Sequence, residues 1–141
     1  MIRKLTIHDY PLAEKRPDLV RGKRGKSADE ITVASVVDGH ITMEDLRITA
    51  TALLQQAEIA RAASRDTLAA NFERAAEMVE VPEDTMMRVY ELLRPGRAKS
   101  KQVLLDAARE LQERHSATRL AEFVTEAADV YEQRGLFKNR F

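Results

Sequence analysis

The sequence has no cysteine and no tryptophan, and its 141 residues include only five glycines and four prolines. Without cysteine, the chain cannot form a disulfide framework, a thiolate zinc site, an iron–sulfur cluster or a cysteine nucleophile. Its formal net charge is zero, with 23 Lys and Arg against 23 Asp and Glu. This balance argues against a surface devoted entirely to nucleic acid or to anionic lipid.

Long apolar runs are also missing. No segment approaches the roughly 18 consecutive apolar residues that a helix needs to cross a bilayer. Residues 1–8 lack the apolar stretch and the small-residue cleavage site of a secretory signal. We therefore expect a cytoplasmic protein that makes no contact with a membrane.

What is present favours helices. Alanine, leucine, glutamate and arginine dominate, and these residues lose little side-chain freedom in a helix. No segment alternates convincingly between apolar and polar residues, as a half-buried strand would. We predict an all-α fold, a small open bundle of three to five helices with an irregular, extended N-terminal region. The expected helices cover about residues 28–38, 50–64, 66–80, 82–94, 100–114 and 116–134.

Start signals support several of these boundaries. Ser27 and Glu30 have the spacing of a capping box, in which each side chain binds the other's backbone N–H. Pro82 precedes two carboxylates, as is typical of a helix start. In the last helix we predict that Phe123 and Tyr131 face the core.

The first 27 residues differ from the rest and are predicted to form a basic arm, followed by a helical domain over 28–141. Residues 1–26 hold eight Lys and Arg against three Asp and Glu, a local charge of +5. Four of these cations lie in the short run Arg21–Lys26. Such a run can bind phosphates, but no aromatic residue interleaves with it for base stacking. A solvated loop, or a strip that docks on an acidic partner, is the favoured interpretation.

No self-contained active site is visible. The three histidines form no HExxH or other close ligand spacing, and they are His8, His40 and His115. We therefore predict no catalytic, cofactor-binding or metal-binding residue in this chain. A helical protein with a partly apolar arm and no site of its own is typical of an interaction subunit.

Contacts with a partner are expected from two groups of side chains. Proline lowers the entropy lost when the arm docks, and its neighbours supply apolar anchors; these predicted anchors are Tyr10, Pro11 and Leu12. Packing of the arm on this chain's own helices is the alternative. Planar guanidinium groups suit interfaces with carboxylates, and the predicted ones are Arg47, Arg74 and Arg94. Salt bridges within the chain are the alternative for these arginines.

Six segments, taken in order, resemble one known family. They are Asp9–Ala13, Asp45–Thr49, Asn71–Glu77, Val81–Asp84, Leu93–Pro95 and Ala121–Arg134. In this order and at these intervals they resemble the small (gamma) subunit of adenosylcobalamin-dependent diol and glycerol dehydratases. Each segment alone is a weak signal, but together they span nearly the whole chain.

The resemblance implies a subunit of a hydro-lyase that holds two copies each of a large (alpha), a medium (beta) and a small subunit. Such enzymes convert 1,2-diols or glycerol to aldehydes with loss of water, through a radical generated from the cobalt-containing adenosylcobalamin. The large subunit carries the substrate site, and the cofactor lies between the large and medium subunits. The resemblance thus implies that this chain packs on the large subunit, binds no cofactor and is inactive alone.

Two points stay open at the level of the sequence. Selectivity between glycerol and 1,2-propanediol is expected in the large subunit, so this chain does not reveal it. Many diol dehydratase small subunits carry a longer Ala/Pro-rich N-terminal extension associated with bacterial microcompartments. Only eight residues precede Asp9 here, which argues against encapsulation and for the shorter glycerol dehydratase form.

Other classes of function compete with this interpretation. The chain could be a free-standing helical interaction module, or a regulator that binds nucleic acid through the basic arm. It could also be an independent enzyme that uses surface carboxylates. Neither alternative explains the ordered set of matching segments.

Overall fold

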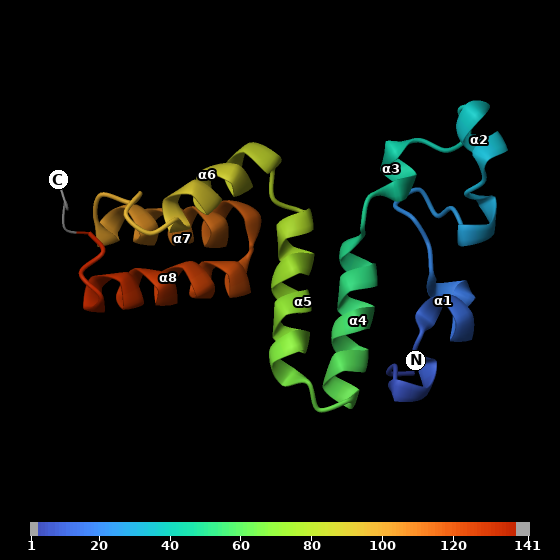
Figure 1. Ribbon diagram of the computed structural model, residues 1–141, viewed down its shortest axis with the longest axis horizontal. Coiled ribbons are helices and arrows are strands. Elements are labelled where there is room, and N and C mark those ends of the chain that lie inside the picture. Colours follow the sequence, from blue (N-terminus) through green and yellow to red (C-terminus); the bar gives the residue numbers. More distant parts are fainter. Residues whose placement is uncertain (1–2, 138–141) are drawn as a thin grey trace. The chain divides into compact units, whose positions relative to one another are not determined.

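The computed structural model describes residues 3–137, and every regular element in that range is helical (Figure 1). This confirms the predicted all-α class. The long helices are α4 (Ala50–Ala62), α5 (Asp66–Val79), α6 (Glu83–Leu93), α7 (Lys101–His115) and α8 (Thr118–Gln133). The short α-helices are α1 (Leu12–Lys15), α2 (Val33–Val37) and α3 (Met43–Leu46), and the 3-10 turns are η1 (Ile7–Asp9), η2 (Pro17–Leu19) and η3 (Ala28–Glu30).

The chain forms two compact units, Met1–Ala76 and Glu77–Phe141, with their boundary inside α5. In the first unit, α4 and α5 run antiparallel and side by side (Figure 1). Ala57 and Ala60 of α4 pack with Ala69 and Phe72 of α5. Alanines let the two backbones approach closely but bury little apolar surface each, so the core of this helical hairpin is thin.

The predicted arm belongs to the same unit as α4. Its η1 turn lies against α4, and the backbone N–H of Leu5 donates to the carboxylate of Glu58 at 3.0 Å. The turns η1 and η2, the helix α1 and a tight turn closed by pairing of Arg21 with Ser27 organise the described part of the arm. The first two residues of the predicted arm lie outside the described residues.

The second unit has the larger apolar core. Helices α7 and α8 pack antiparallel (Figure 1), and α6 contributes Val89 to the same core. Leu104, Leu111 and Val124 are completely buried. The Tyr131 hydroxyl donates to the backbone carbonyl of Leu93, so this partly buried ring satisfies its polar group while it packs against the core.

A single carboxylate fixes the start of α8. Glu77 accepts hydrogen bonds from the backbone N–H groups of Arg119, at 3.1 Å, and Leu120, at 2.9 Å. The first N–H groups of a helix have no partner within it, so a carboxylate placed there satisfies them and interacts favourably with the helix dipole. A residue 42 positions earlier in the chain thus caps α8.

Several local predictions need correction. The helix expected over residues 28–38 is two elements, η3 and α2, because Thr32 adopts an extended backbone and caps α2 through Ser35. Phe123, expected in the core, is 42% exposed, since α8 turns Leu120 and Val124 inward instead. Residues 138–141, beyond the last expected helix, lie outside the described residues. The other long helices begin and end within about two residues of the expected positions.

Candidate partner interface

Exposed apolar side chains concentrate in one stretch of the first unit. We call it the α2–α3 segment, residues 33–48, and six of its large apolar side chains are at least half exposed. They are Val33, Val36, Val37, Met43, Leu46 and Ile48, with exposures from 51% to 82%. Exposed apolar side chains that gather on one surface of a folded chain mark places where another protein binds.

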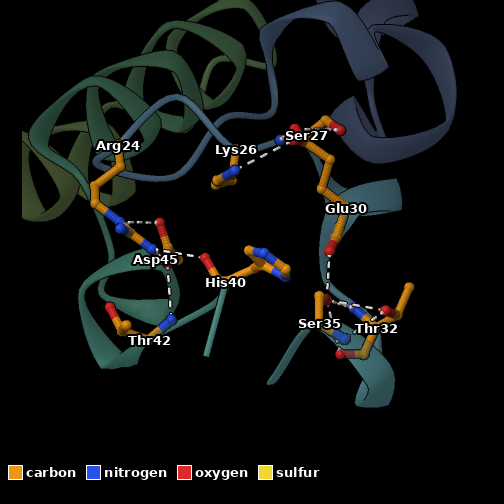
Figure 2. Close-up of polar contacts among 9 residues, drawn as sticks. All are labelled: Arg24, Lys26, Ser27, Glu30, Thr32, Ser35, His40, Thr42 and Asp45. Atoms are coloured by element: carbon orange, nitrogen blue, oxygen red, sulfur yellow. Dashed lines mark hydrogen bonds and ion pairs between the residues drawn. The ribbon is translucent and has the colours of Figure 1, made fainter. Parts of the chain in front are cut away.

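Helix α2 lacks the tertiary packing that a partner could supply. It has five residues and none of them is buried, although helices this short are unstable without tertiary packing. Hydroxyl groups hold its shape instead: Thr32 accepts from the Ser35 N–H at 3.2 Å, and the Ser35 hydroxyl donates to the Glu30 carbonyl at 2.7 Å (Figure 2). Val33, Val36 and Val37 therefore share one side of a formed helix, and each is more than half exposed.

Asp45 fixes the position of α3. Its side chain is fully buried, and it accepts hydrogen bonds from Arg24 Nε at 2.8 Å and from the Thr42 N–H at 2.9 Å (Figure 2). A second bond joins Arg24 Nη2 to the same carboxylate. The bonds from Arg24 and then from Thr42 lower the pKa of Asp45 to about 2, so this carboxylate is charged at neutral pH.

The basic run of the sequence is used within the chain. Besides the Arg24–Asp45 pair, Lys23 pairs with Glu44 at 3.3 Å and Lys26 with Glu30 at 3.6 Å. Arg24 also donates to the backbone carbonyl of His40 at 2.9 Å, which ties the run to the loop between α2 and α3. Three of its four cations thus stabilise the base of the α2–α3 segment, which leaves little for phosphate binding.

Gly22 allows this close approach. A Cβ atom at that position would lie 2.7 Å from the backbone oxygen of Asp45, well inside van der Waals contact. The backbone of the basic run therefore packs directly on α3. Only glycine permits this contact without a shift of one of the two segments.

A second buried carboxylate organises the arm. Asp9 is 4% exposed and accepts from the Thr6 N–H at 2.8 Å and from Arg3 Nη2 at 3.0 Å. The hydrogen bond from the Thr6 backbone is the main cause of a lowered pKa of Asp9. Asp9 and Asp45 fall in family-like segments of the sequence, but neither was predicted to have a structural role, although each ends a Thr-x-x-Asp spacing of the capping-box kind.

The predicted anchors of the arm lie at its surface. Tyr10 is 68% exposed, whereas Pro11 and Leu12 are half-buried, and all three border a groove between the arm and α4. The arm thus packs on its own helices and still presents apolar groups to solvent. The assignment of these residues to a partner interface stays a prediction.

The three predicted arginines all have neighbours within the chain. Arg47 pairs with Glu44 at 3.2 Å, and Arg94 pairs with Glu91 at 3.0 Å. Arg74 donates to the side-chain amide oxygen of Asn71. The structure brings none of the three together with another, so their contact with a partner also stays a prediction.

The histidines and carboxylates of residues 3–137 are not grouped as metal ligands. No set of three or more histidine, aspartate or glutamate side chains there is arranged to hold a metal ion. His8, His40 and His115 come from separate elements, and the first two are exposed. Within the same residues no helix is long and apolar enough to cross a membrane.

An all-α chain with exposed apolar helices fixed by polar groups is typical of a subunit that packs on another protein. Comparison with known proteins identifies which kind of subunit. The profile of the family described as "Dehydratase small subunit" matches residues 5–138, and this chain belongs to that family.

Two relatives show how closely the chain matches. The propanediol dehydratase small subunit of Salmonella typhimurium strain LT2 is 43% identical over 136 residues, which cover 96% of this chain and 78% of the relative. The propanediol dehydratase small subunit of Citrobacter freundii is 44% identical over 132 residues, which cover 94% of this chain and 76% of the relative. The resemblance noted in the sequence is thereby confirmed.

Proposed function

We propose that this chain is the non-catalytic small subunit of a cobalamin-dependent propanediol or glycerol dehydratase. The observation that carries the proposal is the 43–44% identity to two propanediol dehydratase small subunits over almost the whole chain. The complex would convert a 1,2-diol or glycerol to an aldehyde and water. Both relatives are named for propanediol, which favours a 1,2-diol as the substrate.

In the proposed complex the chemistry takes place in other subunits. Adenosylcobalamin, bound by the large and medium subunits, supplies the radical that starts the dehydration. This chain provides neither a ligand for the cofactor nor an acid or base for the substrate. Its role is assembly: it covers apolar surface of the large subunit and stabilises the complex, which holds two copies of each of the three subunits.

The α2–α3 segment is the part of the chain best suited to that contact. Its exposed apolar side chains lose solvent on docking, which is favourable by about 25 cal/mol for each Å² of apolar surface. Its charged neighbours Arg24 and Asp45 are already paired, so docking requires little further desolvation of charge. The large subunit would then cover the exposed sides of α2 and α3.

A binding role for nucleic acid has less support. Most cations of the basic run are paired with carboxylates of the same chain, and a phosphate would have to displace them. The location of the complex in the cytoplasm, and its packaging in a microcompartment, stay predictions from the resemblance.

Co-expression tests the proposal. The chain is produced with the large and medium subunits of the same organism, with an affinity tag on the large subunit, and the complex is separated by size exclusion. We expect this chain to co-elute with the tagged subunit and the complex to form aldehyde from 1,2-propanediol when adenosylcobalamin is added. We expect the purified chain alone to form none.

Omission of the chain is the matched control. The large and medium subunits expressed without it should give less complex or a less stable one. The proposal is wrong if the chain never co-elutes with them, if it dehydrates the diol unaided, or if the complex assembles and turns over equally well in its absence.

A further inference from the structure

A groove of about 620 Å³ lies between the arm and the helical hairpin of the first unit. We call it the arm groove. One wall comes from the arm, with Tyr10, Leu12 and Val20, and the other comes from α4 and α5, with Ile59, Leu68 and Phe72. The volume is within the range of pockets that bind ligands. None of its lining residues belongs to the α2–α3 segment, so it is a separate surface.

Polar contacts outside the groove hold its arm wall in place. The bond from the Leu5 N–H to Glu58 fixes the arm to α4, and buried Asp9 fixes the η1 turn through Thr6 and Arg3. Because these contacts do not use the apolar side chains of the wall, those side chains remain available. These polar contacts therefore keep the arm in place beside α4, and the groove does not depend on apolar contacts between its two walls.

The charges at the groove have one sign. Two arginines, Arg21 and Arg65, line it together with two glutamines, and no carboxylate does. Arg65 makes no ion pair within the part of the chain that the structure describes, whereas Arg21 attracts the nearby carboxylate of Asp18. Arg65 thus contrasts with Arg24, Arg47 and Arg94, which are paired. An apolar groove with an unpaired guanidinium group, that of Arg65, complements an apolar segment that carries a carboxylate.

The openness of the groove favours a polypeptide over a small molecule. Tyr10 is 68% exposed and Leu68 is 36% exposed, so an occupant would keep one side towards solvent or towards the rest of its own protein. Small-molecule sites usually bury 70–90% of a ligand's surface. A segment of a bound protein fits such an open groove, because only one side of the segment has to be buried in it.

We propose that the arm groove receives an apolar segment of the large dehydratase subunit that contains an Asp or Glu, and that this carboxylate pairs with Arg65. The proposal rests on the proposed function for the identity of the partner. It adds a second docking site, distinct from the α2–α3 segment. Tyr10, Pro11 and Leu12, which line the groove, would contact the bound segment.

The absence of cysteine makes a site-directed cross-link straightforward. Ala63 lines the groove, and the neighbouring Ala62 is exposed but does not, so A63C and A62C form a matched pair. Each variant is labelled with a benzophenone maleimide, assembled with the large and medium subunits, irradiated, and digested for mass spectrometry. We expect A63C to cross-link to one peptide of the large subunit that combines apolar residues with an Asp or Glu, at a yield at least fivefold above that of A62C.

Charge reversal tests the carboxylate. R65E places a carboxylate beside the start of α5, where the helix dipole favours it, so the fold should persist. Wild-type and variant chains are co-expressed with the tagged large subunit, and their ratio in the purified complex is measured. We expect R65E to be depleted about tenfold or more, R65K to be depleted less, and K99E, an exposed cation in the second unit, to incorporate as the wild type does.

The possible results separate this proposal from the proposed function. Equal depletion of R65E and K99E, or a cross-link from A63C only to the medium subunit, to a second copy of this chain or to no protein, overturns the groove proposal while the chain remains in the complex. Absence of the wild-type chain from the complex overturns the proposed function as well.

Discussion

Replacement of two valines of α2 by threonine should weaken assembly without unfolding the chain. V33T and V37T change the shape of each side chain very little and have similar helix propensity. In the free chain the new hydroxyl groups face water, because Val33 and Val37 are 82% and 78% exposed. Substitutions at such exposed positions change stability by only about 0.5 kcal/mol.

The magnitude follows from the burial expected on docking. A hydroxyl buried without a hydrogen-bond partner costs about 1–3 kcal/mol in proteins, and nearly the whole of each valine remains to be buried. We therefore expect the double variant to bind more weakly by about 2–6 kcal/mol, which is about 30- to 20,000-fold because 1.4 kcal/mol corresponds to a factor of ten.

Competitive incorporation measures this loss. Wild-type chain and the V33T/V37T variant are co-expressed with a tagged large subunit and the medium subunit, and mass spectrometry gives their ratio in the complex and in the soluble fraction. The variant V33I/V37I, which keeps the surface apolar, is the control and should incorporate within about threefold of the wild type. Equal incorporation of the threonine variant and the isoleucine control, with unchanged thermal unfolding of both, would refute the assignment of α2 to the interface.

Three further predictions concern the chain itself. The pKa of Asp45 is lowered to about 2 from its usual 3.8, so the ionised carboxylate stabilises the folded state. This contribution is fully present above about pH 4 and is lost as the pH falls towards 2. D45N should therefore lower the urea midpoint at pH 7 and flatten its dependence on pH below 4, and an unchanged acid limb would contradict this. L111A should reduce the free energy of unfolding by about 2–5 kcal/mol, because Leu111 is fully buried, as read from urea unfolding by circular dichroism; a loss below 1 kcal/mol would mean that the core closes the cavity. E77A should cost about 1–2 kcal/mol and speed amide exchange at Leu120, whereas unchanged exchange would show that Glu77 does not cap α8.

Local signals in the sequence were enough for most of the helices. The stripe of Leu68, Phe72, Ala75, Ala76 and Val79 has helical spacing, and α5 covers it. Pro82 marks the start of α6 within one residue. Periodicity and capping depend on residues within about four positions of one another, so a single sequence contains them. The error at residues 28–38 has the same origin, because Thr32 offers a competing cap within an apolar run.

Candidate interface residues were harder to foresee. The valines of α2 have the spacing of a buried helix face. This spacing is the same whether the face packs within this chain or against another chain. The three arginines predicted to contact a partner each bind a side chain three residues away in this chain, and Arg65 was not among those predicted. Its importance depends on the groove, whose walls come from segments about 50 residues apart.

The sequence by itself determined that this chain is helical, and its ordered motifs indicated the family to which it belongs. Only the tertiary structure decided that the basic run pairs with Asp45 and its neighbours, that α2 leaves its valines exposed, and that the arm, α4 and α5 border a groove lined by Arg65. The physical reason is that helix formation depends on near neighbours in the chain. Burial and charge pairing depend instead on which distant residues folding brings together, as it does for Arg24 and Asp45, 21 positions apart.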